Sequence, residues 1–186
     1  MFDNYIRRIT ANPIEGETNV YQIHDDKYVK IQMSESAGKK LGVITDVTKD
    51  VMEKRQMRYE NTHDPLTGLY KFDHFKQLAA ERLHRLPDGE VCALVMIDLD
   101  YFKGINDTFG HDAGDRYLQS FSKVMSAMPA DHFLTARRSG DEFCMMVYGC
   151  QSREEIEGQM DAFYEKIRQN QIALSDTETR TISASS

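Results

Sequence analysis

The strongest constraint on the fold is a pair of apolar runs separated by a short polar segment. Residues 132–136 and 143–148 are each rich in residues that favour β-strands. Between them, residues 139–142 read Ser-Gly-Asp-Glu, a composition typical of a tight hairpin turn. The sequence therefore predicts an antiparallel hairpin whose tip holds two adjacent acids, half exposed to water.

The two acids at this tip, Asp141 and Glu142, need an explanation. Two carboxylates about 4 Å apart repel each other by about 4 kcal/mol at an effective dielectric constant of about 20. Such a pair does not stabilise a fold. Either both side chains are splayed into solvent, or a cation lies between them.

A second acidic cluster favours the cation. Residues 91–97 form a continuous apolar run, which predicts a central strand covered on both faces, and this run ends in Asp98-Leu99-Asp100. Asp98 is then expected at the edge of the core, where a carboxylate without a partner is costly. If this strand lies beside the hairpin, Asp98 and Asp141 converge. Hard oxygen ligands indicate magnesium rather than zinc, and few protein ligands leave room for phosphate oxygens.

Composition limits the kinds of partner. The chain has 186 residues and a formal net charge of −7, which argues against nucleic acid and against an anionic membrane as partners. Its three cysteines show no metal-binding spacing and are expected to be buried free thiols of a reducing compartment. No apolar run approaches the ~20 residues of a membrane span, and no signal peptide is recognised. We therefore expect a cytoplasmic protein without membrane contact from this chain.

The first part of the chain is predicted to be a small β segment followed by a helix. Strands are expected over 19–23, 27–33 and 40–45. Residues 42–48 resemble the end of a PAS sensor domain, so residues 1–46 are interpreted as a partial PAS-like β segment without a predicted ligand. Residues 47–63 are expected to form a linker helix, either a polar spacer or a dimer-forming signalling helix.

The second part predicts an α+β domain. After a turn at 64–69, helices are expected over 72–86 and 156–172, and a last strand over 179–184. Residues 101–115 are expected to form a short helix and a tight turn, followed by a longer helix that turns Leu118, Phe121, Val124, Met125 and Met128 inward. From residue 91 onward the order is strand, helix, strand, strand, helix, strand. This order is that of the ferredoxin-like split arrangement, an antiparallel sheet with helices against one face. In that arrangement the first strand lies beside the third, which brings Asp98 close to Asp141.

Three motifs, at 64–69, 97–115 and 137–143, resemble those of the diguanylate cyclase (GGDEF) family in order and spacing. The resemblance covers about residues 62–184 and implies a nucleotide-cyclase-like domain over 64–186. It further implies that two GTP molecules are condensed into cyclic di-GMP with release of pyrophosphate. The family's two-metal chemistry uses Mg²⁺ or Mn²⁺, and a homodimer is required because each domain holds one GTP.

The resemblance also assigns roles to residues at matching positions. Asp98 and Asp141 would bind the metal together with the backbone carbonyl of Leu99, and Glu142 would lie beside the metals. Lys103 would hold the terminal phosphates. The remaining substrate-binding positions are Asn106 and Asp115 at the guanine edge, with Phe102, Ser139 and Gly140 along the nucleotide.

The sequence departs from the family pattern at four places. Ser139 replaces the first glycine of the signature turn, and Lys71-Phe72 replaces a usual Asn-Arg. Residues 130–133 lack the Arg-x-x-Asp of the product-inhibition site, so no feedback site of that type is expected. The family continues beyond the position of Ser186 with a basic helix, so the domain is expected to be truncated at its C-terminus.

Two other functions remain open. A catalytically inactive module that binds GTP or a protein partner would use the same site, and the Ser139 departure favours it. An adenylyl cyclase relative would turn over ATP, but Asn106 and Asp115 argue against this alternative.

Overall fold

The computed structural model describes residues 2–36, 39–175 and 177–186, and the chain divides into two compact units that meet between Tyr59 and Glu60. The first unit contains helix α1 and a three-stranded antiparallel sheet of order β1-β2-β3. Its elements are α1 (Phe2–Ile9), β1 (Val20–His24), β2 (Lys27–Ser36), β3 (Lys39–Asp46) and most of α2 (Thr48–Thr62). The three predicted strands are present, whereas α1 was not predicted. The PAS-like interpretation of this unit stays a prediction.

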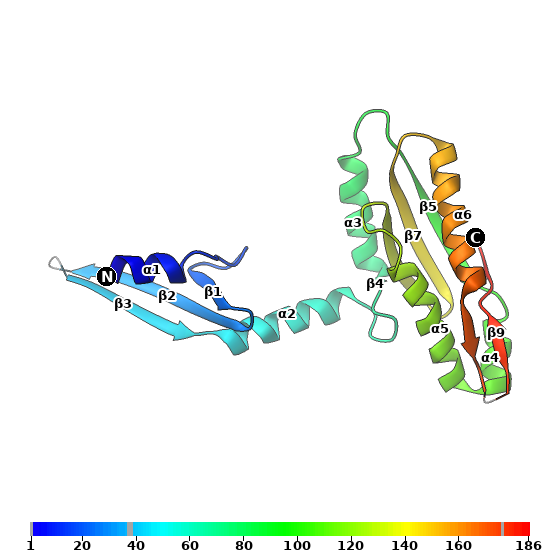
Figure 1. Cartoon of the computed structure of the whole chain (residues 1–186), viewed down its shortest axis with the longest axis horizontal. Coiled ribbons are helices and arrows are strands. Elements are labelled where there is room, and N and C mark those ends of the chain that lie inside the picture. The colour runs from blue at the N-terminus through cyan, green and yellow to red at the C-terminus, as the bar shows by residue number, and fades with distance from the viewer. Residues whose placement is uncertain (1, 37–38, 176) are drawn as a thin grey trace. The chain divides into compact units, whose positions relative to one another are not determined.

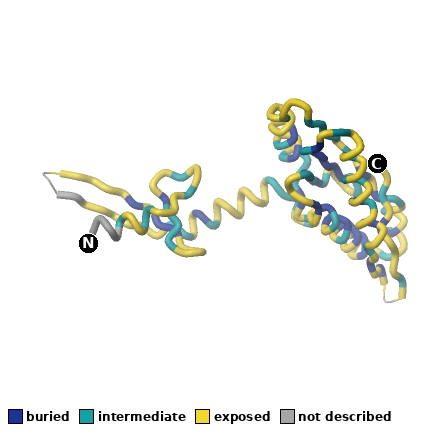
Figure 2. The backbone as a smooth tube through the Cα atoms, turned by 45° about the horizontal axis from the view of Figure 1, so that its top comes forward, coloured by how far each residue is buried: buried dark blue, intermediate teal, exposed yellow. Residues whose placement is uncertain are grey.

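The helix expected over 47–63 is present as α2, but its first half packs against the sheet. Val51 is buried with Val20 and Tyr28 in the core of the first unit. Arg55 donates a hydrogen bond to the Tyr28 hydroxyl, and its guanidinium lies 4.8 Å from the centre of the Tyr28 ring. The second half of the helix is exposed along its length (Figure 2). Only this half therefore has the character expected of a polar linker.

The second unit is built on a five-stranded sheet of order β10-β5-β7-β6-β4. Its strands are β4 (Tyr70–Lys71), β5 (Val91–Leu99), β6 (Phe133–Ser139), β7 (Glu142–Cys150) and β10 (Ala184–Ser185). All neighbouring pairs are antiparallel except β4 and β6, which are parallel. The predicted hairpin is β6–β7, and β5 lies beside β7 as expected.

Helices cover both faces of this sheet (Figure 1). One face packs against α5 (His111–Ser126) and α6 (Arg153–Gln169), with α4 (Phe102–Phe109) at its edge. The opposite face packs against α3 (Phe72–His84), whose Phe75 and Ala79 meet the buried side chains of β6 and β7. The unit is therefore α+β, as predicted. The helices that follow β5 lie against one face, as expected, and α3, which precedes β5, covers the other face.

The prediction that β5 is covered on both faces is wrong. Leu94 and Met96 are 60% and 46% exposed, whereas Ile97 and Leu99 on the other face of the strand are buried. The cause is the placement of α3, which packs over β6 and β7 and leaves this face of β5 uncovered. The strand that is buried on both faces is β7, from Phe143 to Tyr148.

The end of the chain differs from the predicted helix over 156–172 and strand over 179–184. Helix α6 ends at Gln169. The side-chain amide of Asn170, the next residue, donates a hydrogen bond to the backbone carbonyl of Ser120 at 3.2 Å. Two short strands, β8 (Gln171–Ala173) and β9 (Thr179–Thr181), then form a separate antiparallel pair. Ile182 is buried and interrupts the predicted strand, so that β10 pairs with β5 instead of continuing β9.

Candidate active site

The hairpin β6–β7 turns within two residues, Gly140 and Asp141. Ser139 and Glu142 form its closing pair. Gly140 has a φ of +48°, a left-handed conformation that costs glycine little because it carries no Cβ. Asp141 and Glu142 are both half-buried, as the sequence predicts.

Three acids from two strands gather at this end of the sheet. Asp98 at the end of β5 is the cross-strand partner of Glu142, and the backbone N–H of Leu99 donates to the carbonyl of Asp141 at 3.2 Å. Partial desolvation, and then the negative charges of Asp141 and Glu142, raise the pKa of Asp98. The fold therefore brings carboxylates together at a site where they repel one another. The Asp98 side chain is exposed, so the expectation of a carboxylate held at the edge of the core is wrong.

Asp100 has a different role from Asp98. Its two carboxylate oxygens accept hydrogen bonds from the hydroxyls of Ser183 and Ser185, which lower the pKa of Asp100. Its backbone N–H donates to the carbonyl of Ser183 at 3.0 Å. Asp100 does not cap α4, because the residue before this helix is Tyr101, with a φ of +59°. Its hydrogen bonds with Ser183 and Ser185 hold β10 beside the end of β5.

Asn106 and Asp115, the positions expected to contact guanine, come from two helices in contact. Gly114, the residue before Asp115 in α5, is buried against the side chain of Asn106 in α4. The backbone N–H of Gly110, between the helices, donates to the carbonyl of Asn106 at 2.9 Å. Asn106 is half-buried and Asp115 is exposed, so Asp115 is open to a ligand beside the fixed Asn106 side chain.

Lys103 and Phe102 lie in the first turn of α4. The Lys103 side chain is exposed. The Phe102 ring packs at the edge of the core, with its centre 6.4 Å from that of the Tyr117 ring. A ligand contact from Phe102 would therefore come from its backbone.

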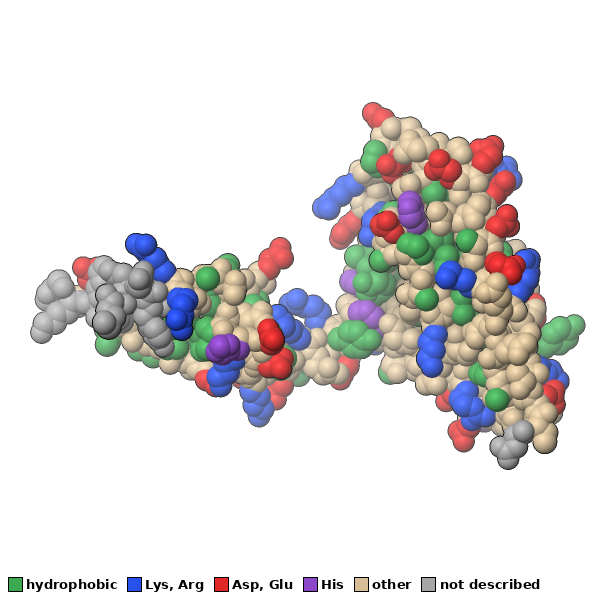
Figure 3. Space-filling model, in the orientation of Figure 1, with side chains coloured by type: hydrophobic (Ala, Val, Ile, Leu, Met, Phe, Trp, Pro, Cys, Tyr) green, Lys and Arg blue, Asp and Glu red, His purple; other side chains and the backbone are tan. Residues whose placement is uncertain are grey.

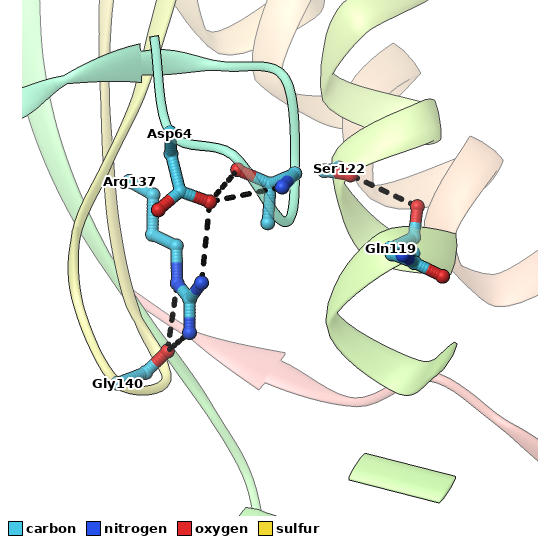
Figure 4. A network of polar contacts seen from close by, with 6 residues as sticks. Asp64, Gln119, Ser122, Arg137 and Gly140 are labelled. Carbon is cyan, nitrogen blue, oxygen red and sulfur yellow. Dashed lines mark hydrogen bonds and ion pairs between the residues drawn. The ribbon is translucent and has the colours of Figure 1, made fainter. Parts of the chain in front are cut away.

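A partly buried ion pair supports the hairpin from the first motif, residues 64–69. Arg137 donates from Nε and Nη2 to the carbonyl of Gly140, at 3.0 and 2.7 Å, and from Nη1 to Asp64 Oδ1 at 3.2 Å (Figure 4). The same Asp64 oxygen accepts from the N–H and the hydroxyl of Thr67, at 2.9 and 2.6 Å. Burial opposes ionisation of Asp64, but these donors outweigh it and lower the pKa of the carboxyl. This role of Arg137 was not predicted from the sequence. The signal available there was an arginine three residues before the glycine of the turn.

The departure Lys71-Phe72 lies beside the same hairpin. Both residues line a surface hollow of about 530 Å³ together with Asp64, Arg138 and Gly140. Lys71 Nζ donates to the backbone carbonyl of Glu60 at 2.6 Å, and the guanidinium of Arg138 lies 5.6 Å from the centre of the Phe72 ring.

The acids at the sheet end fit a hard divalent cation. Within the described part of the chain, no three His, Cys, Asp or Glu side chains form a ready metal-binding group. The expected set needs only two carboxylates, from Asp98 and Asp141, and the backbone carbonyl of Leu99. Partial desolvation and then the neighbouring carboxylates raise the pKa of Asp98, so a cation bound here would relieve the repulsion. Such oxygen donors suit Mg²⁺, which takes its remaining ligands from water and phosphates.

On the face drawn in Figure 3, basic side chains are interspersed with acidic ones rather than gathered in one patch. None of the helices that the structure describes combines the length and the apolar character needed to cross a bilayer.

Comparison with known proteins points to one family. The family described as "Diguanylate cyclase, GGDEF domain" matches residues 61–185. A probable diguanylate cyclase of Escherichia coli, DgcE, is 35% identical over 134 residues, which cover 70% of this chain and 12% of that protein. The diguanylate cyclase DgcN of the same organism is 34% identical over 117 residues, covering 58% of this chain and 29% of that protein. The chain therefore spans less than a third of the length of these relatives.

Solved structures give the same result. The diguanylate cyclase SiaD of Pseudomonas aeruginosa, determined in complex with its activator SiaC, aligns with a TM-score of 0.59 and 28% identity, covering 74% of this chain and 53% of that chain. The GGDEF domain of DgcB from Caulobacter crescentus, in complex with c-di-GMP, aligns with a TM-score of 0.58 and 26% identity, covering 68% and 75%. With three motifs in place, the acids at one end of the sheet and a family match over residues 61–185, this chain belongs to the GGDEF diguanylate cyclase domain family.

Proposed function

We propose that the unit beginning at Glu60 condenses two GTP molecules into cyclic di-GMP and releases pyrophosphate. The observation that carries this proposal is the gathering of Asp98, Asp141 and Glu142 at one end of the sheet, where partial desolvation and then their mutual repulsion raise the pKa of Asp98. A fold that holds like charges together in this way is suited to a cationic ligand. The Mg²⁺ ion that accompanies nucleotide phosphates meets that requirement.

Asp98 and Asp141, with the carbonyl of Leu99, would hold Mg²⁺ or Mn²⁺. When bound, the cation supplies positive charge to the phosphate oxygens of GTP. Glu142, the cross-strand partner of Asp98, would orient the attacking ribose hydroxyl and accept its proton. Gly140 carries no Cβ and lets the nucleotide approach the turn closely.

The nucleotide itself would be held by α4 and α5. Asn106 and Asp115 together offer a hydrogen-bond donor and acceptors, a combination that distinguishes guanine from adenine. Lys103, exposed in the first turn of α4, would contact the terminal phosphates. The backbone N–H groups at the start of the same helix would help, because a helix N-terminus attracts anions.

The reaction requires two copies of the domain. Each unit would hold one GTP, and the hydroxyl of each nucleotide would attack the α-phosphate of the other, so a homodimer is part of the proposal. A cytoplasmic location, where GTP is available, belongs to it as well.

The test is incubation of the protein with GTP and either Mg²⁺ or Mn²⁺, followed by chromatography for cyclic di-GMP and an assay for pyrophosphate. We expect both products, none from ATP, and none from the variants Asp98→Asn and Asp141→Asn. Absence of product from the wild-type protein at GTP concentrations that saturate binding would reject the cyclase activity.

A second candidate is a catalytically inactive GTP-binding or interaction module. The departures at Ser139 and at Lys71-Phe72, which all line the hairpin hollow, favour it. This candidate predicts saturable binding of Mg²⁺-GTP without turnover, so the same experiment separates the two functions.

A further inference from the structure

The carboxylate of Glu142 accepts one hydrogen bond and lies near one cation, and both partners come from its own hairpin. The hydroxyl of Ser139 donates to Glu142 Oε2 at 3.0 Å, and Arg138 Nη1 lies 3.6 Å from Glu142 Oε1. Because Ser139 and Glu142 are paired across the two strands, the hydroxyl and the carboxylate lie on the same side of the sheet. The hydrogen bond from Ser139 and the positive charge of Arg138 together favour one direction of the carboxylate.

A local irregularity of β6 makes this double contact possible. Arg137 pairs with Phe143 and Ser139 pairs with Glu142, so Arg138 is an extra residue in the strand, a β-bulge. Bulges redirect side chains and are frequent beside active sites. The redirected Arg138 guanidinium rests 5.6 Å from the centre of the Phe72 ring, at the first residue of α3. An arginine stacked on an aromatic ring keeps its donors free for a carboxylate.

The surroundings of Glu142 indicate that these contacts affect the direction of its side chain more than the stability of the fold. Glu142 faces Asp98 and adjoins Asp141, so repulsion within the acidic cluster tends to turn its side chain outward. Arg138 and Glu142 are 46% and 41% exposed, and an ion pair so exposed adds little to the free energy of folding. The hydroxyl of Ser139 and the guanidinium of Arg138 therefore affect chiefly the direction of the Glu142 carboxylate.

We propose that Ser139 is a positioning residue for Glu142. Arg138, whose guanidinium lies over the Phe72 ring, assists it. The inference rests on the proposed cyclase function, in which Glu142 acts beside the metal and the ribose hydroxyl. It explains the serine in the signature turn, because the Ser139 hydroxyl orients Glu142 toward Asp98 and the metal.

The first test compares Ser139→Ala, Ser139→Gly and Ser139→Thr. Loss of a hydrogen-bonding partner outside the direct ligands typically lowers metal affinity or activity about 10- to 100-fold. We therefore expect Ala and Gly at this position to lower kcat at least about tenfold, with KM for GTP within about twofold of the wild type. Thr, which keeps the hydroxyl, should restore most of the rate. Ser126→Ala, which removes an exposed hydroxyl at the end of α5, is the matched control.

The second test does not depend on turnover. Binding of Mn²⁺ in the presence of a non-hydrolysable GTP analogue, followed by electron paramagnetic resonance, should weaken in Ser139→Ala and Ser139→Gly. In a Glu142→Ala background, Ser139→Ala should change Mn²⁺ binding no further, because the hydroxyl acts through Glu142. Thermal unfolding followed by circular dichroism checks that each variant is folded.

The outcomes separate the two proposals. A wild-type protein without product rejects the cyclase activity, and the positioning role is then judged on Mn²⁺ binding alone. Wild-type Mn²⁺ binding in both Ser139→Ala and Ser139→Gly would overturn the positioning role. So would an effect of Ser139→Ala that persists undiminished without Glu142, or a loss in Ser139→Thr as large as that in Ser139→Ala.

Discussion

A methyl group on Gly114 would lie 2.0 Å from the side-chain oxygen of Asn106. The glycine in α5 thus makes the space in which the Asn106 amide lies, directly before Asp115. The two positions proposed to read guanine depend on this contact, since any larger residue at position 114 must displace the amide or part the helices.

Gly114→Ala is therefore expected to weaken guanine nucleotide binding about tenfold, the equivalent of one lost hydrogen bond of about 1.4 kcal/mol. Calorimetric titration with Mg²⁺ and a GTP analogue measures this loss. Gly158→Ala in α6 is the control, because a Cβ there meets no atom within 4 Å. The control should leave affinity unchanged and stabilise the helix. Equal affinities in Gly114→Ala and the wild type would contradict the proposed guanine site.

In metal-free protein, removing the Asp98 carboxylate and removing the Asp100 carboxylate should have opposite effects on the stability of the fold. Asp98→Ala relieves repulsion and is expected to leave the melting temperature equal or higher. Asp100→Ala removes the acceptor of the Ser183 and Ser185 hydroxyls and should cost about 1 kcal/mol. Thermal unfolding at pH 7 with EDTA measures both. Because the pKa of Asp98 is raised, its destabilising charge fades as the pH falls through that raised value, and so should the gain in Asp98→Ala. A marked destabilisation by Asp98→Ala would contradict this account.

Asp64→Ala should lower the free energy of unfolding by about 2 kcal/mol, because Arg137 and Thr67 lose a half-buried charged acceptor. The pKa of Asp64 is lowered in the folded state, so its contribution is complete above the unfolded value of about 3.9 and is lost as the pH falls through the lowered value. Denaturant unfolding should show the variant and the wild type converging below about pH 4. Asp161→Ala, an exposed acid of α6, is the control. A difference that stays constant from pH 7 to pH 3 would rule out the ion pair as its source.

Cys144 should resist thiol reagents as long as the protein is folded. Burial raises the pKa of its thiol to about 12, so very little thiolate exists at pH 8. The half-buried Cys92 should be alkylated first. Peptide mass spectrometry after timed iodoacetamide treatment distinguishes the sites, and modification of Cys144 at the rate of Cys92 would show that the core opens readily.

The sequence was sufficient where turn chemistry and strand order act together. The Ser-Gly-Asp-Glu turn defines the hairpin, and the element order from residue 91 places β5 beside β7. Together they predicted that Asp98 and Asp141 come from neighbouring strands. Short elements were missed, because the two residues of β4 and the three of β8 are too few to show a period.

Long-range relationships could not be predicted. The apolar run of β5 does not reveal that α3 leaves Leu94 and Met96 uncovered. The acceptor role of Asp100 depends on Ser183 and Ser185, which only the pairing of β10 with β5 brings beside it. Arg137 and Asp64 are 73 residues apart in sequence, and only the fold brings them into contact.

The central claim is that Asp98 and Asp141 share a divalent cation beside a bound guanine nucleotide. The most direct measurement is an anomalous difference map from crystals soaked with Mn²⁺ and a non-hydrolysable GTP analogue. The account predicts a peak between the two side chains, about 2.1 Å from a carboxylate oxygen of each. A nucleotide bound with no peak there, or a manganese ion that neither carboxylate contacts, would contradict it.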